Sequence, residues 1–201
     1  MTERLFIALE LPEDEKEKLH SLTHNLIKTG SEKAFSSTSG ASEAQRFRIK
    51  GTAKDQLHLT LRFLGSVEKK KIEAVAKSLQ KVNFVPFNLH LSGWGIFSRR
   101  RESILWAGLK ASEALNCLKK TIDEALAECG FPLPTGRYSP HISLLRSKGP
   151  GRIPDQVSGD GGPAIEGCFK VSEFTLFKSD LWPEGARHKA LSRYRATLAN
   201  L

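Results

Sequence analysis

This sequence of 201 residues has few cysteines and no long apolar run, and both absences narrow its class. Its three cysteines, Cys117, Cys129 and Cys168, include no CxxC pair, so neither a disulfide framework nor a zinc ribbon is expected. No apolar run reaches the ~18 residues that cross a bilayer. The N-terminal MTERLFIALELPEDEK has charges where a signal peptide needs an apolar core. We therefore expect a cytoplasmic protein with reduced thiols and no membrane partner.

The charge balance favours a polyanionic partner. The formal net charge is +9 at pH 7. A basic surface attracts phosphate groups and steers their approach, which favours a nucleic acid. A basic composition can also simply keep a protein soluble. The net charge by itself therefore does not decide between nucleic-acid binding and solubility.

The two halves of the chain repeat one order of elements. The first half has a strand at RLFIALELP, a helix with leucines at helical spacing and a strand around His58. The second half has a strand at SILWAGL, a helix at SEALNCLKKTIDEALAECG and a strand around His141. An extended segment follows each histidine strand at the same distance, near Leu91 and near Phe174. This agreement in order indicates an internal duplication.

From this order we predict an α+β fold that is bilobal and duplicated, with two antiparallel-rich sheets facing a central cleft and helices on the outside. Residues 1–201 would form a single domain of two pseudo-symmetric lobes, and a monomer is expected. Two segments depart from the repeat. The Ser-rich residues 31–46 are expected to form a mobile loop. The second half also has a loop after His141 where the first half has a helix.

Two stretches, DQLHLTLRFLG and YSPHISLLRSK, have the same pattern of a histidine with a hydroxyl residue two positions later. Side chains two apart on a strand point to one face, so His58 and Thr60 share a surface, as do His141 and Ser143. If the lobes face one another about a pseudo-twofold axis, the two pairs converge on the cleft.

Two such imidazoles suit in-line displacement at phosphorus, with no covalent nucleophile, metal or cofactor. One neutral histidine would accept the proton of the attacking group, and the other, protonated, would supply the leaving oxygen. The two hydroxyls would donate hydrogen bonds to non-bridging oxygens. Arg146, five residues after His141, would add a charge-assisted contact to phosphate, and Phe63, five after His58, would stack on a base.

Each of these residues also has a purely structural interpretation. A single histidine in a strand is usually packed or solvated, so the functional hypothesis depends on the two motifs standing at corresponding positions. Phe63 fits the core as well as a stacking role, and Arg146 fits a solvated strand end. His20 and His24 lie one helical turn apart without an acidic or cysteine partner at ligand spacing. We therefore predict a solvated helix face there and no metal site.

Five segments together resemble the two-histidine (2H) phosphoesterase superfamily, and within it the RNA 2′,3′-cyclic phosphodiesterase, or 2′-5′ RNA ligase-like, family. These segments are RLFIALELP, LHLTLRFLG, GIFSRR, LWAGL and PHISLLR. The resemblance runs from about Arg4 over nearly the whole chain. It implies a bilobal α+β fold with a central cleft, and metal-independent opening of an RNA-terminal 2′,3′-cyclic phosphate to a 2′-phosphate.

By motif position, the resemblance gives six residues a role: catalytic His58 and His141, phosphate-binding Thr60, Ser143 and Arg146, and substrate-contacting Phe63. We assign His58 as general acid and His141 as general base, and expect RNA ends or cyclic nucleotides as substrates. The chain departs from the family pattern at Ser143, where threonine is commoner, and in its longer Ser-rich insertion. It also has His188 where relatives often have tyrosine, and we assign that histidine no role.

Two other functions stay open. One is reversible 2′-5′ joining of RNA, or cleavage of another cyclic or 2′-5′ phosphodiester. The other is a nucleotide-binding or RNA-binding module without turnover, which the intact histidines and hydroxyls disfavour.

Overall fold

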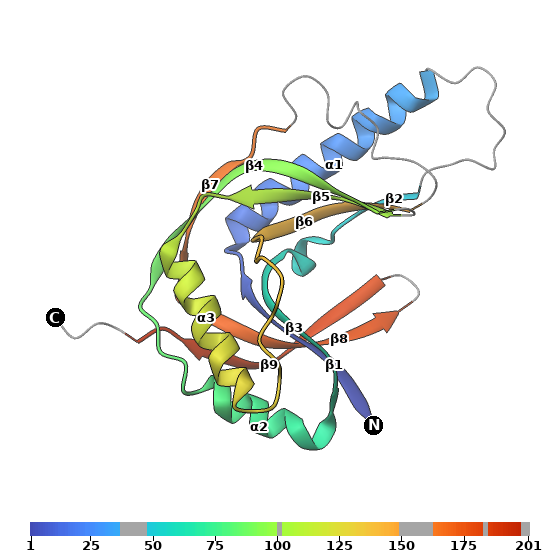
Figure 1. Ribbon diagram of the computed structural model, residues 1–201. Helices are drawn as coiled ribbons and strands as arrows, with labels where there is room; N and C mark the ends of the chain where they lie inside the picture. Colours follow the sequence, from blue (N-terminus) through green and yellow to red (C-terminus); the bar gives the residue numbers. More distant parts are fainter. Residues whose placement is uncertain (37–47, 100–101, 149–162, 183–184, 198–201) are drawn as a thin grey trace.

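The fold is built on one antiparallel sheet, as a computed structural model shows for residues 1–36, 48–99, 102–148, 163–182 and 185–197 (Figure 1). Within these residues, nine strands follow the order β7-β4-β5-β6-β3-β1-β8-β9, with the short β2 paired to β6. The elements in chain order are β1 (Thr2–Glu10), α1 (Glu13–Ser36), β2 (Arg48–Gly51), the 3-10 helix η2 (Lys54–Gln56), β3 (His58–Glu68), α2 (Lys69–Leu79), β4 (Phe87–Arg99), β5 (Glu102–Leu109), α3 (Glu113–Ala127), β6 (His141–Lys148), β7 (Glu166–Val171), β8 (Glu173–Trp182) and β9 (Gly185–Arg195).

The sheet has two arms that meet between β3 and β6. Leu59 and Ile142 are the paired residues at this junction, and the arms diverge from it (Figure 1). One arm holds β6, β5, β4, β7 and β2, and the other holds β3, β1, β8 and β9. The pairing of Leu59 with Ile142 joins the two predicted sheets into one. Both residues are fully buried and pack into a core that the two arms share. The predicted α+β class is confirmed.

Each arm combines strands from both halves of the chain. β4, which follows the first histidine strand, pairs with β5 and β7, whereas β8 returns to pair with β1. Outward from the junction, β3 is followed by β1, β8 and β9, and β6 is followed by β5, β4 and β7. In each arm the strand that carries the histidine motif thus pairs with the first strand of its predicted repeat, β3 with β1 and β6 with β5. The arms correspond to one another, but neither arm is one half of the sequence.

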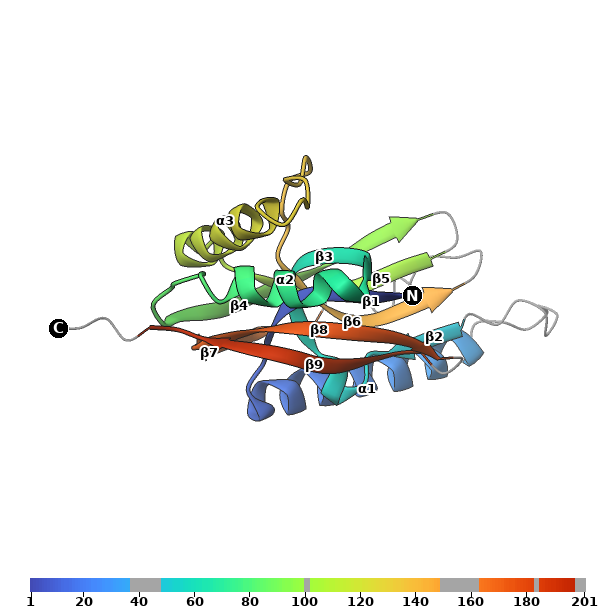
Figure 2. The ribbon, with the colours of Figure 1, turned by 90° about the horizontal axis from the view of Figure 1, so that it is seen from below.

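The helices pack against the strands near the junction. α1 contacts β2 and β6, while α2 and α3 contact β3 and each other. Figure 2 shows α1 and α3 on opposite sides of the strands. The sequence explains α3 well: the Ser112 hydroxyl accepts a hydrogen bond from the Leu115 amide at its start, and buried residues recur at helical spacing through Leu126.

The predicted loop over residues 31–46 begins later than expected. α1 continues to Ser36, so residues 31–36 are helical. The rest of that loop, and most of the loop expected after His141, lie outside the described residues.

The two faces of β1 have different roles. Leu5 and Ile7 join the main core, whereas Phe6 and Ala8 point to the opposite face and form a small buried cluster with Phe177 of β8. This cluster supports the face on which the histidine motifs lie. No helix in the described parts of the chain has the length and apolar character needed to cross a membrane.

Candidate active site

The two histidine motifs lie on the central strands β3 and β6, at the junction of the arms. In each motif the histidine and the hydroxyl residue are half-buried, and the residue between them is fully buried. Because Leu59 and Ile142 are paired and point into the core, the residues that flank them share the opposite face of the sheet. The structure thus brings together the four predicted motif residues: His58, Thr60, His141 and Ser143.

A β-bulge in β3 places Phe63 on the same face as the motif. Phe63 is three residues after Thr60, and an ideal strand would turn it to the other face. In the ladder, however, Thr60 is opposite Ala8 and Phe63 is opposite Phe6, so β3 has one residue more than β1 between these pairs. Phe63 is 71% exposed, and its ring centroid lies 6.0 Å from that of Phe6. It is therefore not a core residue.

An equivalent β-bulge occurs in β6. Ser143 is opposite Trp106 and Arg146 is opposite Ile104, so β6 also has one extra residue between these pairs. Arg146 accordingly lies on the face of Ser143, although the two are three residues apart. Its guanidinium is 3.3 Å from the Glu102 carboxylate, and its side chain is half exposed. Both predicted accessory residues thus occupy equivalent places on the two arms.

Both histidines are anchored through the same ring nitrogen. The Nδ1 atom of His58 lies 2.7 Å from the Gln56 carbonyl oxygen, and Nδ1 of His141 lies 2.9 Å from the Ser139 carbonyl oxygen. A carbonyl oxygen only accepts hydrogen bonds, so each Nδ1 carries the proton and donates it. In a neutral ring Nε2 then has a free lone pair, and in a protonated ring Nε2 is a donor. In each histidine, Nε2 is therefore the ring nitrogen that is able to accept or donate a proton in a reaction.

His58 is enclosed by aromatic side chains. Its ring centroid is 5.0 Å from Phe6 and 6.5 Å from Phe177, and protein atoms surround it on most sides although part of the ring reaches the surface. Burial lowers the pKa of His58 to about 4. The hydrogen bond to Gln56 opposes this shift, and nearby positive charges, Arg146 among them, add to it. His58 is consequently neutral at pH 7 in the free protein.

Aromatic side chains also pack around His141, on the other arm. Its ring centroid is 4.9 Å from Phe97 at an interplanar angle of 83°, and 6.2 Å from Trp106. Gly95 makes room for the indole, because a Cβ atom at that position would lie 2.2 Å from the Trp106 ring. A larger residue at Gly95 would displace the indole that flanks His141.

A third histidine, His188 of β9, belongs to the site and was not predicted. Its ring meets His58 edge to face at 5.3 Å and 88°, and lies 4.7 Å from Phe6. Burial lowers the pKa of His188, and the charge of Asp55 opposes that shift. No sequence motif connects β9 to β3. The one sequence signal that pointed to His188 was that relatives often have tyrosine at this position.

A pocket of about 220 Å³ opens beside His58 and His188. Its floor includes Phe6 and Phe177, and its rim carries charges of both signs. The charged rim residues are Glu10, Lys16, Asp55 and Arg193. On the rim, Arg193 donates to Glu10 at 3.2 Å.

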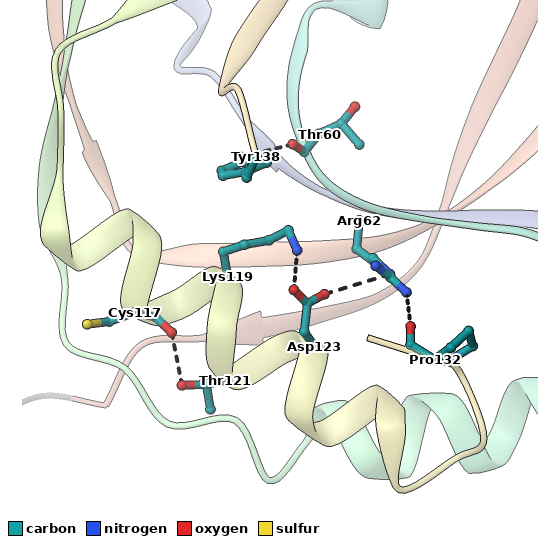
Figure 3. A network of polar contacts seen from close by, with 8 residues as sticks. All are labelled: Thr60, Arg62, Cys117, Lys119, Thr121, Asp123, Pro132 and Tyr138. Atoms are coloured by element: carbon teal, nitrogen blue, oxygen red, sulfur yellow. Dashed lines mark hydrogen bonds and ion pairs between the residues drawn. The ribbon is translucent and has the colours of Figure 1, made fainter. Parts of the chain in front are cut away.

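A buried polar network supports β3 from the side opposite to the motif (Figure 3). Asp123 of α3 pairs with Lys119, one helical turn away, and its other carboxylate oxygen lies 3.7 Å from the Arg62 guanidinium. The Tyr138 hydroxyl donates to the Thr60 carbonyl oxygen at 3.0 Å, next to the bulge. Burial, with the Asp123 charge, raises the pKa of Tyr138, so its hydroxyl stays protonated as a donor. The network holds the bulged part of β3 against α3.

Comparison with known proteins adds family evidence to this geometry. The 2'-5' RNA ligase superfamily model matches residues 32–181. An "RNA 2',3'-cyclic phosphodiesterase" of Thermotoga maritima is 28% identical over 192 residues, which are 94% of this chain and 92% of that protein. A protein of the same name from Geobacillus stearothermophilus is 34% identical over 131 residues, 63% of this chain and 41% of that protein.

A solved structure shows the same architecture. The crystal structure of E. coli LigT complexed with 3'-AMP superposes with a TM-score of 0.70 at 26% identity, covering 98% of this chain and 99% of that one. The family model spans most of the chain and includes both histidine motifs. This chain belongs to the 2'-5' RNA ligase superfamily.

Proposed function

We propose that this protein is an RNA 2′,3′-cyclic phosphodiesterase, which hydrolyses an RNA-terminal 2′,3′-cyclic phosphate to a 2′-phosphomonoester without a metal. The observation that carries the proposal is the equivalent pair of histidines, each anchored through Nδ1 and each beside a hydroxyl residue on the same face. The names of the relatives in Thermotoga maritima and Geobacillus stearothermophilus support the same reaction.

The proposed reaction is a single in-line displacement. Nε2 of His141 accepts a proton from water as the water oxygen bonds to phosphorus. The bond from phosphorus to the ribose 3′ oxygen breaks, and Nε2 of His58 donates its proton to that oxygen. The product has a 2′-phosphate and a free 3′-hydroxyl, and proton exchange with solvent restores both rings. Atoms and charges balance with no other reactant than water.

The low pKa of His58 constrains this assignment. The general acid must be protonated, whereas His58 is neutral at pH 7 in the free protein. A phosphodiester anion next to the ring favours its charged form and so raises its pKa. We therefore assign the acid role to His58 in the substrate complex, where the phosphate offsets the effect of burial.

The other predicted residues would act on the phosphate and the base. The hydroxyls of Thr60 and Ser143 would donate to the non-bridging oxygens, on which negative charge builds up during attack. Arg146 would form a charge-assisted hydrogen bond to the phosphate. Its guanidinium would then either leave the Glu102 carboxylate, its present partner, or contact the carboxylate and the phosphate together. Phe63, exposed on the same face, would stack on the base of the terminal nucleotide.

The reverse reaction is the second candidate function. The same two histidines can run the displacement backwards, with an RNA hydroxyl in place of water, and this would join RNA ends. The superfamily description favours keeping this candidate. Water at its bulk concentration favours hydrolysis, so the hydrolytic direction is our primary proposal.

The test is an assay of product identity. An RNA oligonucleotide with a 2′,3′-cyclic phosphate would be incubated with the protein, and the 2′- and 3′-monophosphate ends would be separated. We expect the 2′-phosphate. A predominant 3′-phosphate would contradict the proposed regiochemistry. Binding of the RNA without any turnover would contradict the enzyme assignment and favour a binding module.

A further inference from the structure

A row of basic residues continues from the site along the arm that holds His141. Lys50 of β2 and Arg146 of β6 are directly opposite one another in the ladder, and Lys148 stands two residues beyond Arg146. All three side chains are exposed. These three residues are called the basic strip below.

The basic strip lies on the face of the catalytic motif. The bulge in β6 brings Arg146 onto the face of Ser143, as described above. Lys148 is two residues further along the strand and Lys50 is directly opposite Arg146, so both point to that face as well. Ile49, next to Lys50, packs against the core on the other side. The strip is therefore continuous with the site and not a separate surface.

The strip places like charges side by side. Lys50 and Arg146 are cross-strand partners, and like charges at such positions destabilise a sheet. Glu102 lies 3.3 Å from Arg146 and offsets one charge. In the ladder Glu102 is opposite Lys148, yet in the described part of the chain neither Lys50 nor Lys148 forms an ion pair with a carboxylate. Among the described residues, the strip thus has positive charge that no carboxylate offsets, and a polyanion would neutralise it.

We infer that the basic strip binds backbone phosphates of the RNA strand that leads to the reacting end, so that the protein prefers an RNA end to a cyclic mononucleotide. The inference rests on the proposed function and specifies its substrate. Arg146, at the end of the strip nearest the motif, would serve the reacting phosphate, and the two lysines would serve phosphates of preceding nucleotides. Phosphate contacts carry no base information, so the preference would hold for any sequence.

The test compares two substrates with one double variant. The wild type and Lys50→Ala/Lys148→Ala would be assayed with a decaribonucleotide ending in a 2′,3′-cyclic phosphate and with 2′,3′-cyclic AMP. For the decamer at low salt we expect kcat/KM to fall about tenfold. The slope of log kcat/KM against log salt should become shallower by about 1.4, because two phosphate contacts are lost at about 0.7 each on a single strand. For the mononucleotide we expect a change of less than about twofold, since it has no upstream phosphate.

The control variant is Lys77→Ala/Lys120→Ala, which removes the same charge from exposed positions on α2 and α3. It should leave both substrates unaffected. Equal losses for decamer and mononucleotide, no loss for either, or an equal loss in the control would each overturn the inference.

A binding measurement separates this inference from the proposed function. Fluorescence anisotropy with a labelled decamer ending in a 2′-phosphate should show weaker binding by the double variant, again about tenfold. If the wild type cleaves neither substrate, the proposed function fails. If it cleaves both and the double variant binds and cleaves the decamer as the wild type does, only the basic strip is refuted.

Discussion

The rings of His58 and His188 meet edge to face, with centroids 5.3 Å apart and planes at 88°. This relationship joins the first motif to β9, which no sequence pattern connected to it. After burial, which is the main cause, a positive charge on His188 is among the factors that hold the pKa of His58 down. The two rings are therefore expected to titrate as an interacting pair.

Replacing His188 by glutamine should raise the pKa of His58 from its present value of about 4 toward the ordinary histidine range, because the repelling charge is removed. NMR titration of the imidazole resonances would measure this. His20→Gln on α1 is the matched control and should leave the His58 titration in place. An unchanged pKa in the His188 variant would show that the two rings do not interact, and a lower pKa would show that His188 stabilises the charged form of His58 instead of repelling it.

His58→Ala and His141→Ala should each lower kcat by roughly 100-fold or more, because each removes one partner of proton transfer. Both residues are only half-buried, so the fold should persist, as circular dichroism and thermal unfolding would show. His24→Ala, at an exposed position on α1, is the control and should retain full activity. Near-normal turnover by either variant of the pair would eliminate the two-histidine mechanism.

Thr60→Ala and Ser143→Ala should each reduce kcat/KM by less than the histidine variants do. Each deletes one hydrogen bond to a charged oxygen, which is worth about 1.5 to 3 kcal/mol. Thr60→Ser and Ser143→Thr keep the hydroxyl and should retain most of the activity. If the alanine variants lose as much as the histidine variants, the hydroxyls do more than bind phosphate. If the conservative variants lose as much as the alanine ones, packing and not the hydroxyl is responsible.

Activity should survive a strong chelator. Both Nδ1 atoms are committed to backbone carbonyls and both Nε2 atoms to proton transfer in the proposed reaction, so neither histidine is available as a metal ligand. The measurement is turnover before and after dialysis against EDTA, with metal content followed in parallel. Loss of activity that added divalent metal restores would overturn the metal-independent mechanism.

The rate should be bell-shaped in pH, since the reaction needs one neutral and one protonated imidazole together. As general acid, His58 must hold its proton, so the rate falls as pH rises through the pKa of His58. That pKa is about 4 in the free protein and higher when a phosphate anion is bound. The falling limb should therefore lie at higher pH for kcat, which reports the substrate complex, than for kcat/KM, which reports the free enzyme. Coincident falling limbs would argue that His58 is not the acid.

The sequence by itself determined where the two histidine motifs lie, which residues of each share a face, and the class of fold. A histidine and a hydroxyl two residues apart within an apolar strand must share one face, and the apolar neighbours Leu59 and Ile142 must point into the core. The helices and most strands followed from apolar periodicity, because that periodicity reflects one buried face per element. These are local rules, and they were sufficient to place His58, Thr60, His141 and Ser143 on one face of the sheet.

Only the tertiary structure decided which distant elements meet and where the strands bulge. Phe63 and Arg146 are three residues past their hydroxyl partners, and period-two alternation alone would place them on the wrong face. An extra residue in each strand corrects this, and it is visible only from the register with β1 and β5. Likewise, His188 reaches His58 through the pairing of β9 with β8 and of β8 with β1. Register and strand order depend on contacts far apart in the chain, which local pattern does not encode.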